Sequence, residues 1–254
     1  MKRLKNIGIK LTPTVFFMII LMSWQYIVDR GIVARYILPS PLDIIITTFR
    51  ILPELKPHII TTLEEAFTGF FIAILLAIIL AVLMDSFSLV KRAFYPLFIV
   101  SQTIPIIVLL PLLIMWFGFD KLPKIIVVIL VCFFPIVVNL LEGLESIDRD
   151  MLNLFKSMKA NYFQIFKFAK FPAALTSFFS GLKIAATYSV MGAVIGEWMG
   201  GKDGLGVYMT RVRQSFALDK VFSAIVIIIL LSLILFKTIE LIQYLTMPWM
   251  RENK

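Results

Sequence analysis

The stretch LEEAFTGFFIAILLAIILAVLM, at positions 63–84, decides the class of fold. After Glu65 it carries no charged side chain before Asp85. An α-helix needs about 20 apolar residues to cross the hydrocarbon core of a bilayer. We therefore predict a transmembrane helix over this stretch.

Comparable apolar runs occupy residues 11–28, 94–117, 122–141, 172–195 and 221–241. Hydrophobic residues make up 60% of the 254-residue chain and charged residues 16%, and the mean hydropathy is +0.94. Soluble domains contain about 45–50% apolar and about 25% charged residues. The chain is thus predicted to be an all-α, polytopic membrane helical bundle of about six transmembrane helices. We expect it to form one transmembrane domain over residues 1–254.

Prolines modify two of the predicted elements. Residues 94–117 contain Pro96, Pro105 and Pro111, and a span tolerates proline where neighbouring groups satisfy the freed backbone. We expect this helix to be kinked and interior rather than lipid-facing. Residues 36–60 hold four prolines and are predicted not to span. Within them Ser40-Pro41 resembles an N-cap followed by a first-turn proline, which predicts a short interfacial helix.

The formal net charge of +9 does not point to nucleic acid, because Lys and Arg collect on the cytoplasmic loops of membrane proteins. The N-terminal segment is basic (Lys2, Arg3, Lys5, Lys10), and so is the segment 151–171. If the chain crosses the membrane six times and its N-terminus is cytoplasmic, both basic segments lie on the cytoplasmic side. The sequence thus predicts a multi-pass cell-membrane protein whose N- and C-termini are both cytoplasmic.

The chain carries few residues suited to catalysis or metal binding. Cys132 is the single cysteine and His58 the single histidine. Cys132 lies in an apolar run and is predicted to be a buried hydrophobe. No nucleophile–base set and no metal-ligand spacing is visible, so we expect no enzyme activity, no catalytic residue and no metal site.

Residues 147–172 are the most informative polar stretch. Asp148 can cap a helix whose apolar positions follow the spacing i, i+3, i+4, i+7: Met151, Leu154, Phe155 and Met158. Asn161 interrupts this helix, a second short helix is predicted after it, and Pro172 suits the first turn of the next span. Two interpretations stay open: a hairpin lying on the membrane surface, or a docking element for a soluble partner.

Several sequence motifs resemble a known family. They are Leu38-Pro39-Ser40-Pro41, ANYFQIF at 160–166, FPAAL at 171–175, and Glu197-Trp198 before Gly204-Leu205-Gly206. In these the chain resembles the inner-membrane permease subunits of ATP-binding-cassette (ABC) importers, in the branch that imports sulfonates, nitrate and thiamine precursors. The family's cytoplasmic signature contains Glu-Ala-Ala, then a glycine and later a proline. Aligned on Pro172, it places residues 153–155 at Glu-Ala-Ala and Lys159 at the glycine, and only the proline is identical.

The resemblance implies a type I ABC importer permease that has no cofactor of its own, with ATP and Mg²⁺ on the partner subunit. Its implied partners are an ABC ATPase, an extracytoplasmic substrate-binding protein, a second permease copy in a homodimer, and the lipid bilayer. It implies a coupling-helix segment at 148–171 that docks the ATPase through Asn153, Leu154, Phe155, Lys156, Met158, Lys159, Ala160 and Pro172. The stretches 196–209 and 215–225 are similar to the thiamine-precursor (hydroxymethylpyrimidine) group. A sulfonate, taurine or nitrate permease and a stand-alone secondary transporter are the alternatives.

Polar groups inside spans are candidates for a solute path, because burying them in lipid is costly. These candidates are Gln102, Thr103, Asn139, Thr187 and Tyr188, with Trp198 beside them. Gly181, Ala185, Gly192 and Gly196 recur at small-xxx-small spacing and are predicted to form a packing seam. Residues 196–203 nearly match a phosphate loop, but Asp203 stands where the motif needs a hydroxyl. Glu64 and Glu65 are expected to be solvated, and no role is assigned to them.

Overall fold

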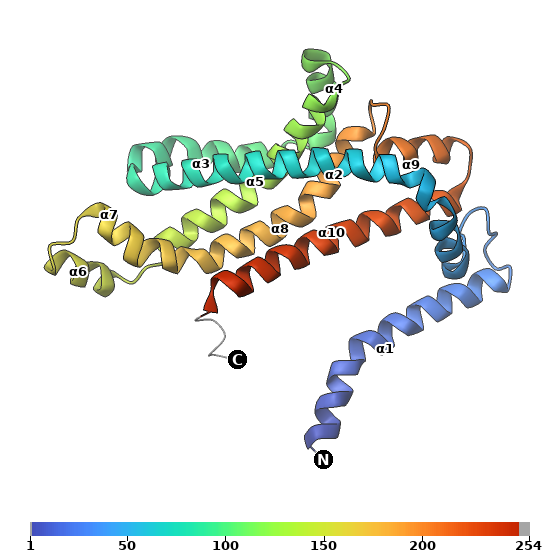
Figure 1. Ribbon diagram of the computed structural model, residues 1–254, viewed down its shortest axis with the longest axis horizontal. Helices are drawn as coiled ribbons and strands as arrows, with labels where there is room; N and C mark the ends of the chain where they lie inside the picture. Colours follow the sequence, from blue (N-terminus) through green and yellow to red (C-terminus); the bar gives the residue numbers. More distant parts are fainter. Residues whose placement is uncertain (1, 249–254) are drawn as a thin grey trace. The chain divides into compact units, whose positions relative to one another are not determined.

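The structure is a computed structural model that describes residues 2–248, and every regular element in that part of the chain is helical. The elements are α1 (Lys2–Asp29), α2 (Pro41–Ser86), α3 (Ser88–Thr103), α4 (Ile106–Phe117), α5 (Lys121–Glu145), α6 (Arg149–Ser157), α7 (Tyr162–Ile165), the π-helical turn η1 (Phe166–Lys170), α8 (Phe171–Glu197), α9 (Leu205–Gln214) and α10 (Leu218–Thr246). The predicted all-α class is confirmed (Figure 1).

Within the described residues, five helices are long and apolar enough to cross a membrane, or six if the bent pair α3–α4 counts as one span. Each of the six predicted spans falls on one of these helices or on the bent pair. The basic side chains of the first ten residues and the C-terminal residues 249–254 lie outside the described part, so the location of the termini stays a prediction.

The chain divides into two compact units, which are described separately. The first contains the residues up to Lys56 together with Tyr208–Ile227, and the second contains Pro57–Val207 and the residues from Ile228 onward. The prediction of a single transmembrane domain stays a prediction.

In the first unit, the start of α2 is fixed by the predicted cap. The backbone N–H of Asp43 donates to Ser40 Oγ at 3.1 Å, and Pro41 occupies the first helical position. The hydroxyl of Thr47, one turn further along α2, donates to Asp219 Oδ2 on α10 at 3.2 Å. The Ser223 hydroxyl reaches the carbonyl of Ile44 at 3.2 Å.

A separate interfacial helix before the second span was predicted, and this is wrong. α2 continues from Pro41 through Pro53 and Pro57 to Ser86. Pro57 removes only the backbone donor to the carbonyl of Pro53, and the helix continues on both sides of it. Proline therefore weakens α2 at this point without ending it.

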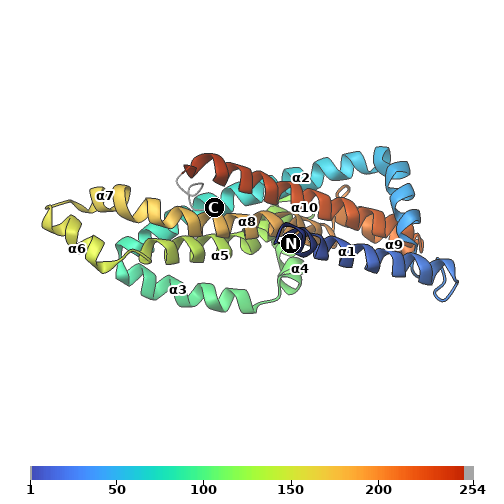
Figure 2. The ribbon, with the colours of Figure 1, turned by 90° about the horizontal axis from the view of Figure 1, so that it is seen from below.

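In the second unit, α5 and α8 pack most closely, and they run side by side in Figures 1 and 2. The small residues of α8 make this possible: a Cβ on Gly181 would lie 2.6 Å from the carbonyl oxygen of Pro135 in α5. Gly196 approaches Lys124 in the same way, with 2.9 Å from such a Cβ to the Lys124 Cα. The predicted packing seam is confirmed. Cys132 lies buried in it, as predicted, with Sγ 3.3 Å from the carbonyl oxygen of Ala185.

The proline-rich span is bent more sharply than predicted. α3 and α4 meet at 101° around Ile104 and Pro105, because Pro105 cannot donate the backbone bond that would continue the helix. The prediction that this span is interior is wrong for α3 in the single chain, since none of its residues is buried, whereas α4 buries Leu110 and Leu113. α3 packs on the core through Val90, Tyr95 and Phe98, and the ring centroid of Phe98 is 5.2 Å from that of Phe133 in α5.

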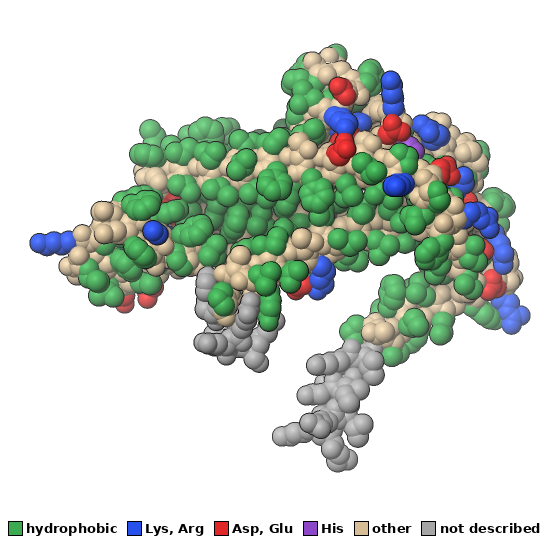
Figure 3. All heavy atoms as spheres, viewed as in Figure 1, with side chains coloured by type: hydrophobic (Ala, Val, Ile, Leu, Met, Phe, Trp, Pro, Cys, Tyr) green, Lys and Arg blue, Asp and Glu red, His purple; other side chains and the backbone are tan. Residues whose placement is uncertain are grey.

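Hydrophobic side chains cover the middle of the second unit's helices on the face seen in Figure 3, and Lys and Arg side chains appear near the tip formed by α6. This distribution fits helices that face lipid along their length and water at their ends.

Candidate functional site

The docking element predicted from residues 147–172 begins with helix α6. The Asp148 carboxylate accepts a hydrogen bond from the Asp150 N–H at 3.2 Å, which confirms the predicted cap. Within the chain the side chains of Leu154 and Met158 are 59% and 71% exposed, while Phe155 is half-buried. The helix therefore presents apolar side chains that the described chain does not cover.

The turn after α6 has the geometry of a Schellman motif. Lys159 has φ +56°, in the left-handed region. Its N–H donates to the carbonyl of Lys156 at 2.9 Å, and the Ala160 N–H donates to that of Phe155 at 3.0 Å. Lys159, which aligns with the family's glycine, thus adopts the conformation that glycine favours. The turn does not require glycine, although a side chain there costs free energy.

The second short helix differs from the prediction. Asn161 caps α7 in a capping box with Gln164, but α7 then continues through η1 into α8 without a break. Pro172 lies in the first turn of α8, as predicted, and α8 follows directly on this π-helical turn. The wider turn, in which the Phe171 N–H donates to the Phe166 carbonyl, lets the helix continue although Pro172 has no N–H to donate.

At this end of the second unit, the carboxylate of Asp85 in the last turn of α2 holds two side chains. Lys170 Nζ lies 2.6 Å from Asp85 Oδ1, and the Tyr162 hydroxyl donates to Asp85 Oδ2 at 3.2 Å. The Tyr162 hydroxyl also lies 2.7 Å from Ser86 Oγ. Asp85 is almost fully buried, with 3% of its side chain exposed.

The predicted path residues do not meet in one cavity. Gln102 and Thr103 are exposed at the end of α3, and Tyr188 and Trp198 are exposed on α8 and just after it. Two path residues form local bonds along their own helices. Thr187 Oγ1 donates to the carbonyl of Lys183, and Asn139 Nδ2 donates to that of Pro135 at 2.7 Å. Their role in transport stays a prediction.

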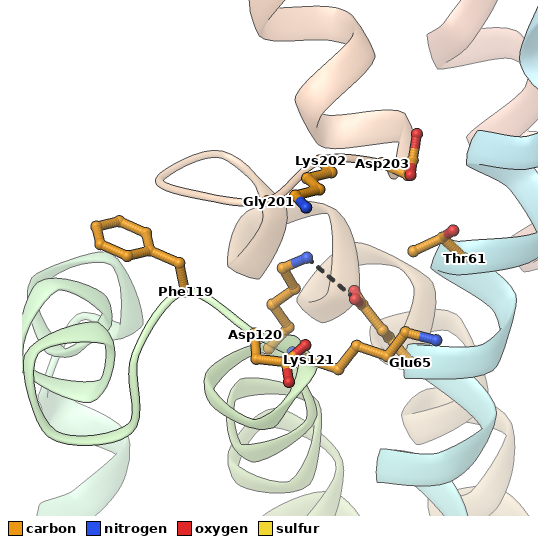
Figure 4. Close-up of a pocket in the computed structure, with 9 residues that line it drawn as sticks. Thr61, Glu65, Phe119, Asp120, Lys121, Gly201, Lys202 and Asp203 are labelled. Atoms are coloured by element: carbon orange, nitrogen blue, oxygen red, sulfur yellow. Dashed lines mark hydrogen bonds and ion pairs between the residues drawn. The ribbon is translucent and has the colours of Figure 1, made fainter.

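A cavity of about 530 Å³ lies at the other end of the α5–α8 pair (Figure 4). Its lining combines acidic, basic and backbone groups: Thr61, Glu65, Phe119, Asp120, Lys121, Lys124, Gly201, Lys202 and Asp203. None of the predicted path residues is among them.

Beside this cavity lies a buried polar cluster, made of His58, Thr62, Glu65, Lys124 and Glu197. Lys124 Nζ lies 3.1 Å from Glu65 Oε1, the contact drawn as a dashed line in Figure 4. Both side chains are buried, with 5% and 0% exposed. The expectation that Glu65 is solvated is therefore wrong, because α5 brings Lys124 against this face of α2.

The same cluster holds the start of α9. Three successive backbone N–H groups donate to it: that of Gly204 to His58 Nδ1 at 3.0 Å, that of Leu205 to Thr62 Oγ1 at 2.9 Å, and that of Gly206 to Glu197 Oε2 at 2.6 Å. Thr62 Oγ1 in turn donates to Glu197 Oε1 at 2.6 Å. The first N–H groups of a helix have no partner within it, and these side chains satisfy them.

Glycine is required in this loop. Gly204 has φ +129° and lies directly over the Glu197 carboxyl group, so a side chain would be strained and would collide with it. The sequence pattern Glu197-Trp198 before Gly204-Leu205-Gly206 indicates a family resemblance but does not by itself predict these contacts. A glutamate so near a glycine-rich stretch was the one signal that could have indicated this cluster.

The family described as binding-protein-dependent transport system inner membrane component matches residues 73–252. The chain belongs to this family. As a member, it is an ABC importer permease, an integral multi-pass subunit of the inner membrane, as the sequence predicted.

Three relatives illustrate the range of the family. The chain is 38% identical to the formylaminopyrimidine transport permease protein ThiX of Halalkalibacterium halodurans over 244 residues, which cover 96% of this chain and 97% of ThiX. It is 30% identical to the riboflavin transport system permease protein RibX of Chloroflexus aurantiacus, over 92% of this chain and 88% of RibX. It is 26% identical to the putative aliphatic sulfonates transport permease protein SsuC of Bacillus subtilis, over 91% and 84%.

Proposed function

We propose that this permease imports a small heteroaromatic vitamin precursor, of the pyrimidine type from which thiamine is built. The observation that carries the proposal is the 38% identity to a formylaminopyrimidine permease over nearly the full length of both chains. A flat, polar ring also suits the amide of Gln102 and the rings of Tyr188 and Trp198, which we propose as path residues with Thr103, Asn139 and Thr187.

The substrate is tested by gene deletion. In a strain that cannot make the thiamine pyrimidine, deleting the gene should abolish growth on low external formylaminopyrimidine. Restoring the gene on a plasmid should restore growth. Unimpaired growth, combined with loss of growth on an aliphatic sulfonate as sulfur source, would transfer the protein to the sulfonate branch, to which SsuC is named as belonging.

We also propose that α6 is the docking helix for a separate ATPase, which binds the ATP and Mg²⁺. Leu154 and Met158 are exposed, and Phe155 lies half-buried between them. Burying one such side chain contributes about 1.5–3 kcal/mol, so the three together could anchor a partner. Lys156 and Lys159 lie at the polar edge and would orient the partner more than hold it.

Docking is tested with two substitutions on this face. Leu154→Asp is the sharper one, because the side chain is 59% exposed and the change removes little packing within the chain. Phe155→Asp is expected to act in the same way with some loss of stability. Both should fold but fail to co-purify with the ATPase, and ATP-driven uptake should stop. Phe168→Asp, in the exposed part of η1, is the matched control and should retain the ATPase.

Two results would contradict the docking proposal. One is recovery of a full complement of ATPase with folded Leu154→Asp protein and intact uptake. The other is wild-type permease that transports without any co-purifying ATPase, which would instead support a stand-alone secondary transporter.

The remaining parts of the proposal concern assembly and orientation. We propose that two copies of this chain form the pathway, served by an extracytoplasmic binding protein, and that both termini are cytoplasmic. A reporter that is active only in the cytoplasm, fused after Lys254, should be active. An inactive but stably inserted fusion would reverse the topology.

A further inference from the structure

The last turn of α2 contacts the α6–α7 segment (residues 148–170) through Asp85, whose carboxylate receives two side chains, and through Ser86, whose hydroxyl lies 2.7 Å from that of Tyr162. Lys170, which ends η1, and Tyr162, which begins α7, both bond to this single carboxylate. The Tyr162 ring also stacks on that of Phe166 at 6.5 Å between centroids. Asp85 therefore holds both ends of the helical stretch that follows the proposed docking helix.

We propose that Asp85 is a positioning residue that transmits movement of the α6–α7 segment to α2. The inference rests on the proposed docking of an ATPase at α6. A partner that pulls on α6 displaces the turn at Lys159 and then α7, and the bonds to Asp85 make α2 follow. Without them, the segment could move while α2 stays in place.

The burial of this ion pair distinguishes it from its neighbour. Asp85 and Lys170 have 3% and 17% of their side chains exposed, so their attraction is little screened by water. Lys91 in the first turn of α3 and Glu145 at the end of α5 also form an ion pair, but 36% and 41% of their side chains are exposed. Exposed pairs contribute little to stability or coupling.

α2 gives this contact a long reach. From Asp85 back to Thr62 the helix rises about 1.5 Å per residue, or about 35 Å. Thr62 and Glu65 are members of the buried polar cluster that holds the start of α9. Rigid helices are among the elements that carry coupling between distant sites. A movement received at Asp85 would thus arrive at the cavity end of the second unit.

The test uses the permease purified with its ATPase and binding protein and reconstituted in liposomes. Asp85→Asn keeps the shape of the side chain and removes the charge that faces Lys170. Tyr162→Phe keeps the stacked ring and removes only the hydroxyl, so it should fold even if Asp85→Asn does not. Glu145→Gln, which breaks the exposed pair, is the control.

The readout is the amount of labelled formylaminopyrimidine imported per ATP hydrolysed. Both variants should retain the ATPase and hydrolyse ATP, while this ratio falls between about twofold and thirtyfold, the range found for substitutions along coupling networks. Glu145→Gln should keep the wild-type ratio. Lys170→Asp combined with Asp85→Lys, which reverses the pair, should recover part of it. A fall in hydrolysis and import in the same proportion would show a merely structural role and overturn the inference.

A second readout does not depend on the substrate. Spin labels on Leu75→Cys in α2 and Phe163→Cys in α7, both exposed, report whether the two helices move together, and the buried Cys132 should stay unlabelled. The distance should stay constant on ATP binding in the wild type and change or broaden in Asp85→Asn. A distance that changes equally in the wild type and in Asp85→Asn overturns the inference. If the wild-type permease does not retain the ATPase, the docking proposal fails instead. If the wild type imports no formylaminopyrimidine, the substrate proposal fails and the label distances decide.

Discussion

At one end of the α5–α8 pair, Lys124 and Glu197 lie among buried polar partners from α2 and from the start of α9. At the other end, α6 carries Leu154 and Met158 with most of their apolar surface exposed. The first end pairs Lys124 with Glu65 and gives the backbone donors at the start of α9 their partners within the chain. The second end leaves apolar surface that only something outside the described chain can cover.

This difference assigns the two ends different tasks. Bonds that the chain completes by itself fix the arrangement of α2, α5, α8 and the start of α9 before any partner arrives. An exposed apolar helix, followed by a turn in an unfavourable conformation, gains from a partner that covers it. The comparison therefore predicts large effects on stability at the buried end and effects on binding, with small effects on stability, at the α6 end.

The largest expected effect is at the buried ion pair. Lys124→Met should lower the free energy of unfolding by about 3–5 kcal/mol, because Glu65 is left as a buried charge without its partner. Lys121→Met is the matched control on the same turn of α5. Its partner Glu64 is exposed and the pair contributes about 0–1 kcal/mol. Denaturant or thermal unfolding of the purified protein measures both changes.

The ion pair can be tested further with a double variant. Adding Glu65→Gln to Lys124→Met removes the unpaired charge and should restore part of the lost stability. If Lys124→Met and Lys121→Met destabilise the protein equally, the buried ion pair contributes no more to stability than the exposed one, and the comparison between the two ends fails.

A smaller effect is expected at Thr62. Thr62→Val removes the hydroxyl that accepts from the Leu205 N–H and donates to Glu197, and an unsatisfied buried group costs about 1–3 kcal/mol. Thr61→Val is the control, because the Thr61 hydroxyl is outside the cluster and bonds only the carbonyl of Pro57 in the described structure. Faster hydrogen exchange at the Leu205 and Gly206 amides in Thr62→Val alone would confirm the assignment. Unchanged exchange there would contradict it.

The spans and the caps could be predicted from the sequence because they depend on neighbouring residues. Apolar length located the five long helices and the bent α3–α4 pair, and the caps at Ser40 and Asp148 followed from residue types beside helix starts. The seam along α8 was also predictable, since Gly181 and Gly196 share one face of a single helix.

The buried polar cluster could not be predicted because its partners are distant in the sequence. Glu65 and Lys124 are 59 positions apart, and Thr62 and Glu197 are 135 apart. Glu65 lies near a predicted loop, so the local sequence predicts a solvated side chain. Only the packing of α5 against α2 shows that it is buried. The continuity of α2 through Pro57, and of α7 into α8 before Pro172, was not predictable for a related reason: a proline shows where a backbone donor is lost, but not whether the helix ends there.

The smallest expected effect has the opposite sign and lies at the α6 end. Lys159→Gly should raise the free energy of unfolding by about 1 kcal/mol. The left-handed conformation costs a residue with a side chain about 1–2 kcal/mol, and it costs glycine little. Glycine's greater freedom in the unfolded chain offsets part of this gain. Lys159→Ala removes the same charge and side chain but keeps a Cβ in that conformation, so it should bring no such gain. The difference between the two variants isolates the backbone strain from the loss of the lysine. The charge can then be examined separately: if Lys159 orients the ATPase, both variants should slow its association and weaken the dependence of that rate on salt, while glycine alone stabilises the permease. Equal unfolding free energies for the glycine and alanine variants would mean that the turn does not store this strain, and that the α6 end is as well satisfied by itself as the buried end.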